Sequence, residues 1–247
     1  MKRYFIYIFF ALLILGTWQY AGHNNTVRVL LSQPTLIAEY LATNIVNLIE
    51  ATQATFYEAL AGLFLASLFS FGTMILCFYF PKLMDYILPV MIISQVIPLI
   101  TLAPLFIILF GAGLTAKIMM AALLCFFPIF VNFANGVKLI SANIHELMYV
   151  YNATTTQKIR HIYFPLALPQ IMTGLKVAAT LAVIGAIVAE FNGAEMGLGK
   201  NLFLAAKRLE PELMMCSLFF SAILGGIMYL CIYLMERRVG NWYLQNS

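Results

Sequence analysis

The sequence predicts an all-α polytopic membrane protein with six transmembrane helices, both termini in the cytoplasm, and a cytoplasmic loop of two short helices. The first observation is composition: 63% of the 247 residues are hydrophobic and only 10% are charged. Charged residues make up about a quarter of an ordinary soluble domain, so this class is excluded. The second observation is the mean hydropathy of +0.92. The third is a series of uncharged runs of about 20 residues, the length that crosses a bilayer.

Each apolar run is expected to cross the membrane once, and together the runs form a single transmembrane domain over residues 1–247. Pro89, Pro98 and Pro104 interrupt the third run. Lys176 lies near one end of the fifth run, where its long side chain can reach the interface. The expected spans are 4–22, 58–80, 87–110, 115–136, 171–190 and 212–235.

The first span has a rival interpretation, because Lys2 and Arg3 before an apolar run are also typical of a secretory signal peptide. The run continues through Trp18 and Tyr20, whose rings suit a membrane interface. No small-residue cleavage site follows it. An uncleaved first span is therefore favoured.

Orientation follows from the basic residues, because cytoplasmic loops carry an excess of Lys and Arg. With the N-terminus in the cytoplasm, nine of the 14 Lys and Arg residues face the inside and the other five face the outside. The reversed orientation would invert this ratio. The inner group is Lys2, Arg3, Lys82, Lys138, Lys158, Arg160, Lys176, Arg237 and Arg238, and the outer group is Arg28, Lys117, Lys200, Lys207 and Arg208.

The segment between the fourth and fifth spans, residues 138–169, is polar and rich in turns. Apolar residues recur in it at helical spacing, which predicts a short amphipathic helix in each half. An uncovered apolar face needs a cover, either the inner ends of the spans or a partner protein. The residues with this spacing are Ile144, Leu147, Met148 and Tyr151 in the first half and Ile159, Ile162 and Tyr163 in the second.

Local signals set the limits of these two helices. Asn143 precedes Glu146 by three residues and Thr154 precedes Gln157 by three, a spacing typical of capped helix starts. The second helix is expected to stop near Phe164, because a proline disfavours helical geometry in the residue before it.

The same loop resembles the E-A-A-x3-G-x9-I-x-L-P segment of ABC-type importer permeases. The matching positions are Glu146-Leu147-Met148, Asn152 and Ile162-Tyr163-Phe164-Pro165, at the same spacing throughout. Leu147 and Met148 replace the two alanines, and Asn152 replaces the glycine. Asn is the residue after Gly that best tolerates a left-handed backbone, so the turn is expected to survive that change.

Four further segments extend the resemblance over nearly the whole chain. They are similar to the branch of importers for nitrate, sulfonates, taurine, bicarbonate or vitamin precursors. The segments are FPIFVN at 127–132, FPLALPQIMTGLK at 164–176, AEFNGAEMGLGK at 189–200 and MERRVGNWY at 235–243.

This resemblance implies a permease of the bacterial inner membrane that forms a homodimer with a second copy. It implies two cytoplasmic ATPase subunits and an extracytoplasmic solute-binding protein as partners. The loop 143–165 would act as the coupling element that seats in the ATPase. The coupling residues implied by the resemblance are Glu146, Leu147, Met148, Tyr151, Asn152, Ile162 and Pro165.

Chemistry within the chain itself is not indicated. The run from Ala194 to Asn201 comes near a phosphate-binding loop, but Ala194 and Asn201 replace the first Gly and the final Ser or Thr of that motif. The three histidines lack a second ligand at metal spacing. We therefore expect no catalytic residues, no cofactor and no metal, with ATP hydrolysis in a partner. The alternative is a secondary transporter or channel of six helices, which would usually show internal repeats and mid-membrane charges.

Polar residues inside the spans are the candidates for a solute pathway, because lipid disfavours them. The small residues Ala182, Gly185 and Ala186 allow close backbone approach, which suits a dimer seam or a pore wall. A sparse polar pathway favours a neutral or aromatic cargo over a strong anion. The pathway candidates are Ser94, Gln95, Thr101, Asn132, Asn135, Thr180 and Glu190.

Overall fold

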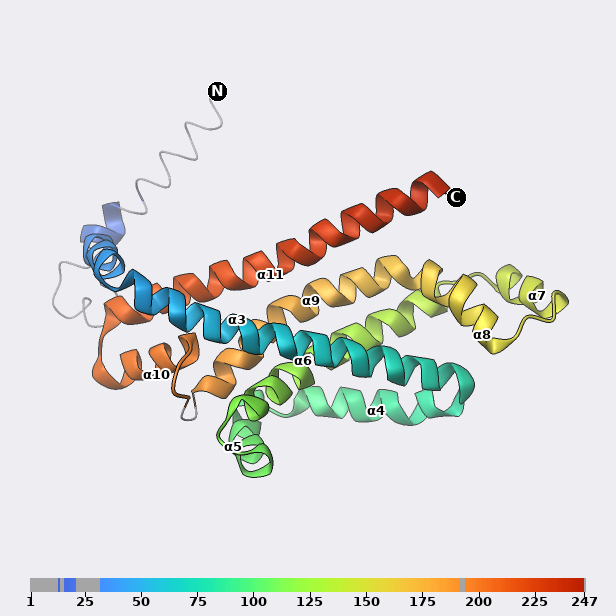
Figure 1. The fold of residues 1–247 in the computed structure, drawn as a ribbon, viewed down its shortest axis with the longest axis horizontal. Coiled ribbons are helices and arrows are strands. Elements are labelled where there is room, and N and C mark those ends of the chain that lie inside the picture. Colours follow the sequence, from blue (N-terminus) through green and yellow to red (C-terminus); the bar gives the residue numbers. More distant parts are fainter. Residues whose placement is uncertain (1–12, 14–15, 21–31, 192–193, 247) are drawn as a thin grey trace, which may run out of the picture.

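A computed structural model describes residues 13, 16–20, 32–191 and 194–246, and all regular structure in these residues is helical. The helices lie side by side as an elongated bundle (Figure 1). The helix α7 projects from one end of the bundle and α10 lies near the other, so we name these the α7 end and the α10 end. The elements are α3 Pro34–Tyr79, α4 Lys82–Val96, α5 Leu99–Phe110, α6 Leu114–Lys138, α7 Ala142–Val150, α8 Thr155–Lys158, the π-helix η1 Ile159–Tyr163, α9 Phe164–Glu190, α10 Leu198–Arg208 and α11 Pro211–Asn246.

Among the described residues, four helices are long and apolar enough to cross a membrane, and a bent pair makes up to five. The four are Pro34–Tyr79, Leu114–Lys138, Thr155–Glu190 and Pro211–Arg238. The first predicted span, 4–22, lies mostly outside the described residues. The all-helical, polytopic class is therefore confirmed, while the count of six spans and the location of the termini stay predictions.

The predicted third span, 87–110, is not one straight helix. Helices α4 and α5 are bent by 111° against each other at Ile97 and Pro98. Ile97 has an extended backbone, with φ −72° and ψ 123°. The physical reason is the Pro98 ring, which disfavours helical geometry in the residue before it. The pair therefore crosses as a broken span or enters and leaves from one side.

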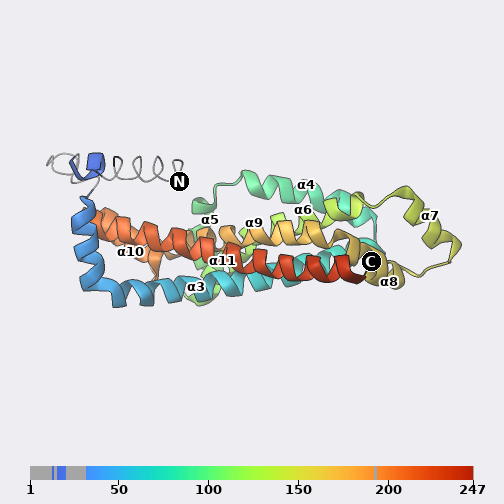
Figure 2. The same ribbon diagram turned by 90° about the horizontal axis from the view of Figure 1, so that it is seen from above.

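Helix α3 begins well before the predicted start of the second span at residue 58. Its 46 residues would extend about 69 Å if straight, more than twice the hydrocarbon thickness of about 30 Å. The backbone leaves helical geometry at Asn44, whose amide donates to the Tyr40 carbonyl oxygen at 3.2 Å. Figure 2 shows the segment before this kink turned away from the line of the rest of α3.

The centre of the bundle is the contact between α6 and α9, where small residues replace bulky ones. A Cβ atom on Gly185 would lie 2.7 Å from the Ala121 Cα atom, and one on Gly136 would lie 2.8 Å from the Ala167 Cβ atom. Ala182 and Ala186 are fully buried beside this contact. These residues thus bring two helices of one chain together, and the predicted dimer seam or pore wall lies elsewhere.

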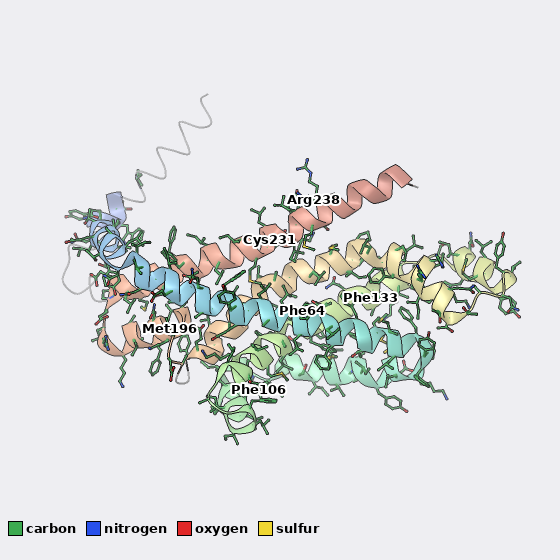
Figure 3. The ribbon with its side chains drawn as sticks, viewed as in Figure 1. Phe64, Phe106, Phe133, Met196, Cys231 and Arg238 are labelled. Carbon is green, nitrogen blue, oxygen red and sulfur yellow. The ribbon has the colours of Figure 1, made fainter. Side chains whose placement is uncertain are left out.

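Aromatic rings fill the bundle nearer the α7 end. Phe133 is buried and meets Phe71 and Phe78 edge-on, with ring centroids 5.9 and 6.0 Å apart. Figure 3 shows Phe133 within the bundle and Phe64 on the outer side of α3, where 70% of Phe64 is exposed. Such exposed apolar side chains are expected where lipid or another subunit replaces water.

The close contact of α6 and α9 gives a test of packing. Gly185→Ala should destabilise the fold by about 1–3 kcal/mol, because its methyl group meets backbone that cannot move aside as a side chain can. Thermal unfolding in detergent measures this loss. Gly72→Ala is the matched control, since nothing lies within 4 Å of its added methyl group. Equal melting temperatures for the two variants would contradict this packing.

The predicted orientation can be tested by labelling single cysteines in intact cells. Gly113→Cys, at the exposed start of α6, should react with an impermeant thiol reagent added outside. Tyr149→Cys, at a position that is 83% exposed on α7, should not react until the membrane is opened. Labelling of Tyr149→Cys in sealed cells would contradict the predicted orientation and place α7 outside the cell.

Candidate functional site

The loop between α6 and α9 folds as two helices joined by a left-handed turn. Asn152 has a φ of 52°, so the turn expected at this position is confirmed. The Thr154 hydroxyl accepts from the Gln157 backbone N–H, and the Gln157 side chain accepts from the Thr154 N–H at 2.8 Å. This reciprocal capping box confirms the predicted start of the second helix.

Two predicted limits of this loop are wrong. Helix α7 begins at Ala142 after Ser141, and no side chain caps it, so Asn143 is not its cap. The second helix also does not stop near Phe164. It runs from α8 through η1 into α9, with Pro165 in the first turn of α9. Pro165 has no N–H to donate, and the π-turn of η1 directly before it lets the helix continue through this position.

The π-helix η1, Ile159–Tyr163, joins the loop rigidly to the span above it. A π-turn inside a longer helix is rare and is found mostly at functional positions. Tyr163 in η1 stacks on Phe78 at the end of α3, with centroids 4.8 Å apart. The Tyr79 hydroxyl lies 2.8 Å from the Thr156 hydroxyl. Because of these contacts, a displacement of α8 would be transmitted to both α3 and α9.

Helix α7, in contrast, stands free of the bundle. None of its residues is buried, and it lies beyond the helix ends in Figure 1. Tyr151 is 73% exposed and Leu147 is 49% exposed. Glu146 and Asn152 are also exposed, while Met148, Ile162 and Pro165 are half-buried. The ends of the spans that the structure describes thus do not cover this apolar face.

A second polar site lies at the α10 end and joins α3, α6, α9 and α10. Its members are Thr55, Glu58, Lys117 and Glu190. The Lys117 ammonium group contacts the Glu58 carboxylate at 2.6 Å, and 3% of the Glu58 side chain is exposed. The second carboxyl oxygen of Glu58 is buried and has no hydrogen-bond partner among the described residues.

Glu190 fastens the start of α10 to the bundle. The Thr55 hydroxyl donates to Glu190 Oε1 at 2.7 Å and accepts from the Leu198 N–H at 2.9 Å. Glu190 Oε2 accepts from the Gly199 N–H. Gly197 has a φ of 134°, and a side chain on it would overlap the Glu190 carboxyl group. The glycine-rich run 194–201 thus binds the carboxylate of Glu190 through its backbone, as a phosphate-binding loop binds an anion.

The predicted pathway residues are not brought together within one chain. Four of them, Ser94, Thr101, Asn132 and Thr180, donate to carbonyl oxygens of their own helices. Gln95, Thr101 and Asn135 are exposed. Glu190 is 1% exposed and belongs to the buried site, so it does not line an open path. A solute pathway lined by the six other candidates would need a further protein surface opposite them.

The chain matches the family described as binding-protein-dependent transport system inner membrane component over residues 60–242. This match includes the whole loop from α7 to η1. The chain belongs to this family. It is therefore an inner-membrane permease component of an ABC importer, and the resemblance found in its sequence is confirmed.

Relatives of this permease are named for the transport of several different solutes. The riboflavin transport system permease protein RibX of Chloroflexus aurantiacus is 36% identical over 62% of this chain and 58% of its own length. The formylaminopyrimidine transport permease protein ThiX of Halalkalibacterium halodurans is 29% identical over 94% of both chains. The MetNI methionine ABC transporter in an inward-facing conformation shares the fold, with a TM-score of 0.70 over 79% of this permease and 97% of that chain at 18% identity.

Sequence reasoning missed the buried site, although a signal for it was present. Glu58 and Lys117 begin the second and fourth predicted spans, and Glu190 ends the fifth. With alternating spans, all three lie at the same side of the membrane. Opposite charges at one level of a bundle are expected to pair, because an unpaired charge there is costly.

The ion pair in this permease predicts an asymmetric response to mutation. Lys117→Met should destabilise the fold by about 3 kcal/mol, because it leaves a buried carboxylate without its partner. Glu58→Leu combined with Lys117→Met should recover most of this loss, because neither charge remains. Denaturation of the purified protein in detergent measures both.

Glu210→Ala serves as the control for this pair. It removes the partner of Arg208 from an exposed contact of 3.9 Å, and such contacts contribute little. The interpretation fails if the double variant is less stable than Lys117→Met alone.

Proposed function

We propose that this permease is driven by a separate ATPase, which it engages through α7, α8 and η1. The observation that supports this most is the exposed apolar face of α7 beside the left-handed turn at Asn152. None of the described residues covers this face, and apolar residues in this position suit a cleft of a partner. The capping box and η1 then pass a movement of the partner on to α9.

The proposed partners follow from the family and from the surfaces left open. A family of binding-protein-dependent systems implies an extracytoplasmic solute-binding protein. A second copy of the permease is proposed to cover α4 and α5. Helix α4 has no buried residue, and Ile92, Ile93 and Val96 on it are each at least 59% exposed. A homodimer would place Ser94, Gln95 and Thr101 opposite their counterparts and thereby complete a pathway.

The proposed cargo is a small neutral or aromatic solute. The names of two relatives, for riboflavin and formylaminopyrimidine, support a heteroaromatic compound. The pathway candidates other than Glu190 are hydroxyl and amide side chains without charge. A second group of relatives is named for sulfonates and taurine, so the binding protein is the component that separates these classes.

The coupling proposal is tested by separating partner binding from folding. Tyr151→Ala removes an exposed aromatic anchor, whose truncation typically costs about 2 kcal/mol of binding. Asn152→Pro forbids the positive φ on which the turn depends. Both variants should insert and fold normally, yet lose co-purification with the ATPase and lose uptake.

Asn152→Gly is the matched control, because glycine adopts the same φ without strain. It should retain both ATPase binding and uptake. Normal co-purification and normal uptake by Tyr151→Ala and by Asn152→Pro would leave this loop as a plain connection between two spans.

A further inference from the structure

A cavity of about 330 Å³ lies at the α7 end, between four elements of the bundle. The end of α3, the start of α4, the end of α6 and the α8–η1 segment surround it. Most of its wall is apolar, with Met74, Met84 and Tyr163 among its residues. Its polar part is formed by Lys138, Thr155 and Lys158.

The two lysines give this cavity an uncompensated positive charge. Lys138 ends α6 and Lys158 ends α8, so they approach the cavity from different elements. Neither forms an ion pair with a carboxylate in the part of the chain that is described. No acidic residue of the described chain lines the cavity. Two cations beside an apolar wall match a ligand that has an anionic group and a hydrocarbon part.

The position of the cavity relative to the membrane indicates that such a ligand comes from the lipid bilayer. Two candidate spanning helices, α3 and α6, end beside it at Tyr79 and Lys138, and α4 of the bent pair begins there at Lys82. Helix ends of this kind lie at the level of the lipid headgroups. This end is the cytoplasmic one in the predicted orientation, and the cytoplasmic leaflet is the anionic one.

We propose that this cavity binds an anionic phospholipid of the inner leaflet. The phosphate group would lie between the ammonium groups of Lys138 and Lys158, with the Thr155 hydroxyl as a neutral donor. The acyl chain would follow the apolar wall formed by the half-buried Phe78 and Met84. Because Lys158 belongs to the coupling segment, the lipid would brace that segment against α3 and α4. This step rests on the proposed function only for the orientation of the α7 end.

An acidic surface of the ATPase is the competing occupant. The lysines would suit it equally, but the apolar wall would not. Met74 and Ala134 lie within spans rather than in the projecting α7, which favours a hydrocarbon chain.

The test measures lipid binding to the purified full chain by native mass spectrometry. Phosphatidylglycerol is titrated into protein held in a zwitterionic detergent, with phosphatidylcholine as the neutral comparison. Phosphatidylglycerol should bind more tightly than phosphatidylcholine. Lys138→Ala combined with Lys158→Ala should weaken phosphatidylglycerol binding about tenfold or more, as the loss of two cations near a headgroup predicts.

Two matched variants make the result specific. Lys207→Ala with Arg208→Ala removes the same charge at the α10 end and should leave the affinity unchanged. Lys138→Arg with Lys158→Arg keeps both cations and should retain binding. Circular dichroism confirms that each variant is folded.

Three outcomes would overturn the proposal. The first is unchanged phosphatidylglycerol affinity in the Lys138→Ala, Lys158→Ala variant. The second is full competition by inorganic phosphate, which would make this a site for free phosphate. The third is loss of ATPase co-purification with lipid affinity intact, which would assign the lysines to a protein interface. The coupling test uses Tyr151 and Asn152, which do not line the cavity, so the two failures are distinguishable.

Discussion

The close contact of α6 with α9 is the constraint on which the rest of this permease depends. Within a bilayer, apolar side chains gain nothing by leaving lipid for protein, so helices associate through packing and hydrogen bonds. Gly185 against Ala121 and Gly136 against Ala167 let two backbones touch along most of their length. Helix α3 packs on this pair through Gly62, and the remaining helices are arranged around the three.

The two ends of the bundle differ in the exposure of their polar residues. At the α10 end, the buried Glu190 holds the start of α10, and the buried Glu58 pairs with the half-buried Lys117 to join α3 to α6. At the α7 end, the polar and apolar residues of α7 are exposed to a partner. A fixed α10 end and a free α7 segment are the arrangement that the proposed coupling needs, because force applied at one end must move the helices as a body.

The family and the two-helix loop between α6 and α9 follow from local sequence. Asn152 reaches a left-handed φ because its short amide side chain tolerates it, and Thr154 with Gln157 caps a helix through contacts three residues apart. Both features depend on neighbours in the chain. Pro165 shows the limit of such reasoning. Its effect on Phe164 is a preference, and the π-turn before it keeps the helix continuous into α9.

The sequence by itself determined the membrane class, the apolar runs, the left-handed turn and the capped helix, because hydropathy and local hydrogen bonds act over a few residues. Only the tertiary structure decided that Glu190 meets Thr55 and Gly199, that Lys117 meets Glu58 and that Gly185 meets Ala121. Thr55 and Glu190 are 135 positions apart. Such contacts depend on the rotation and depth of each helix in the bundle, which the pattern of one span does not specify.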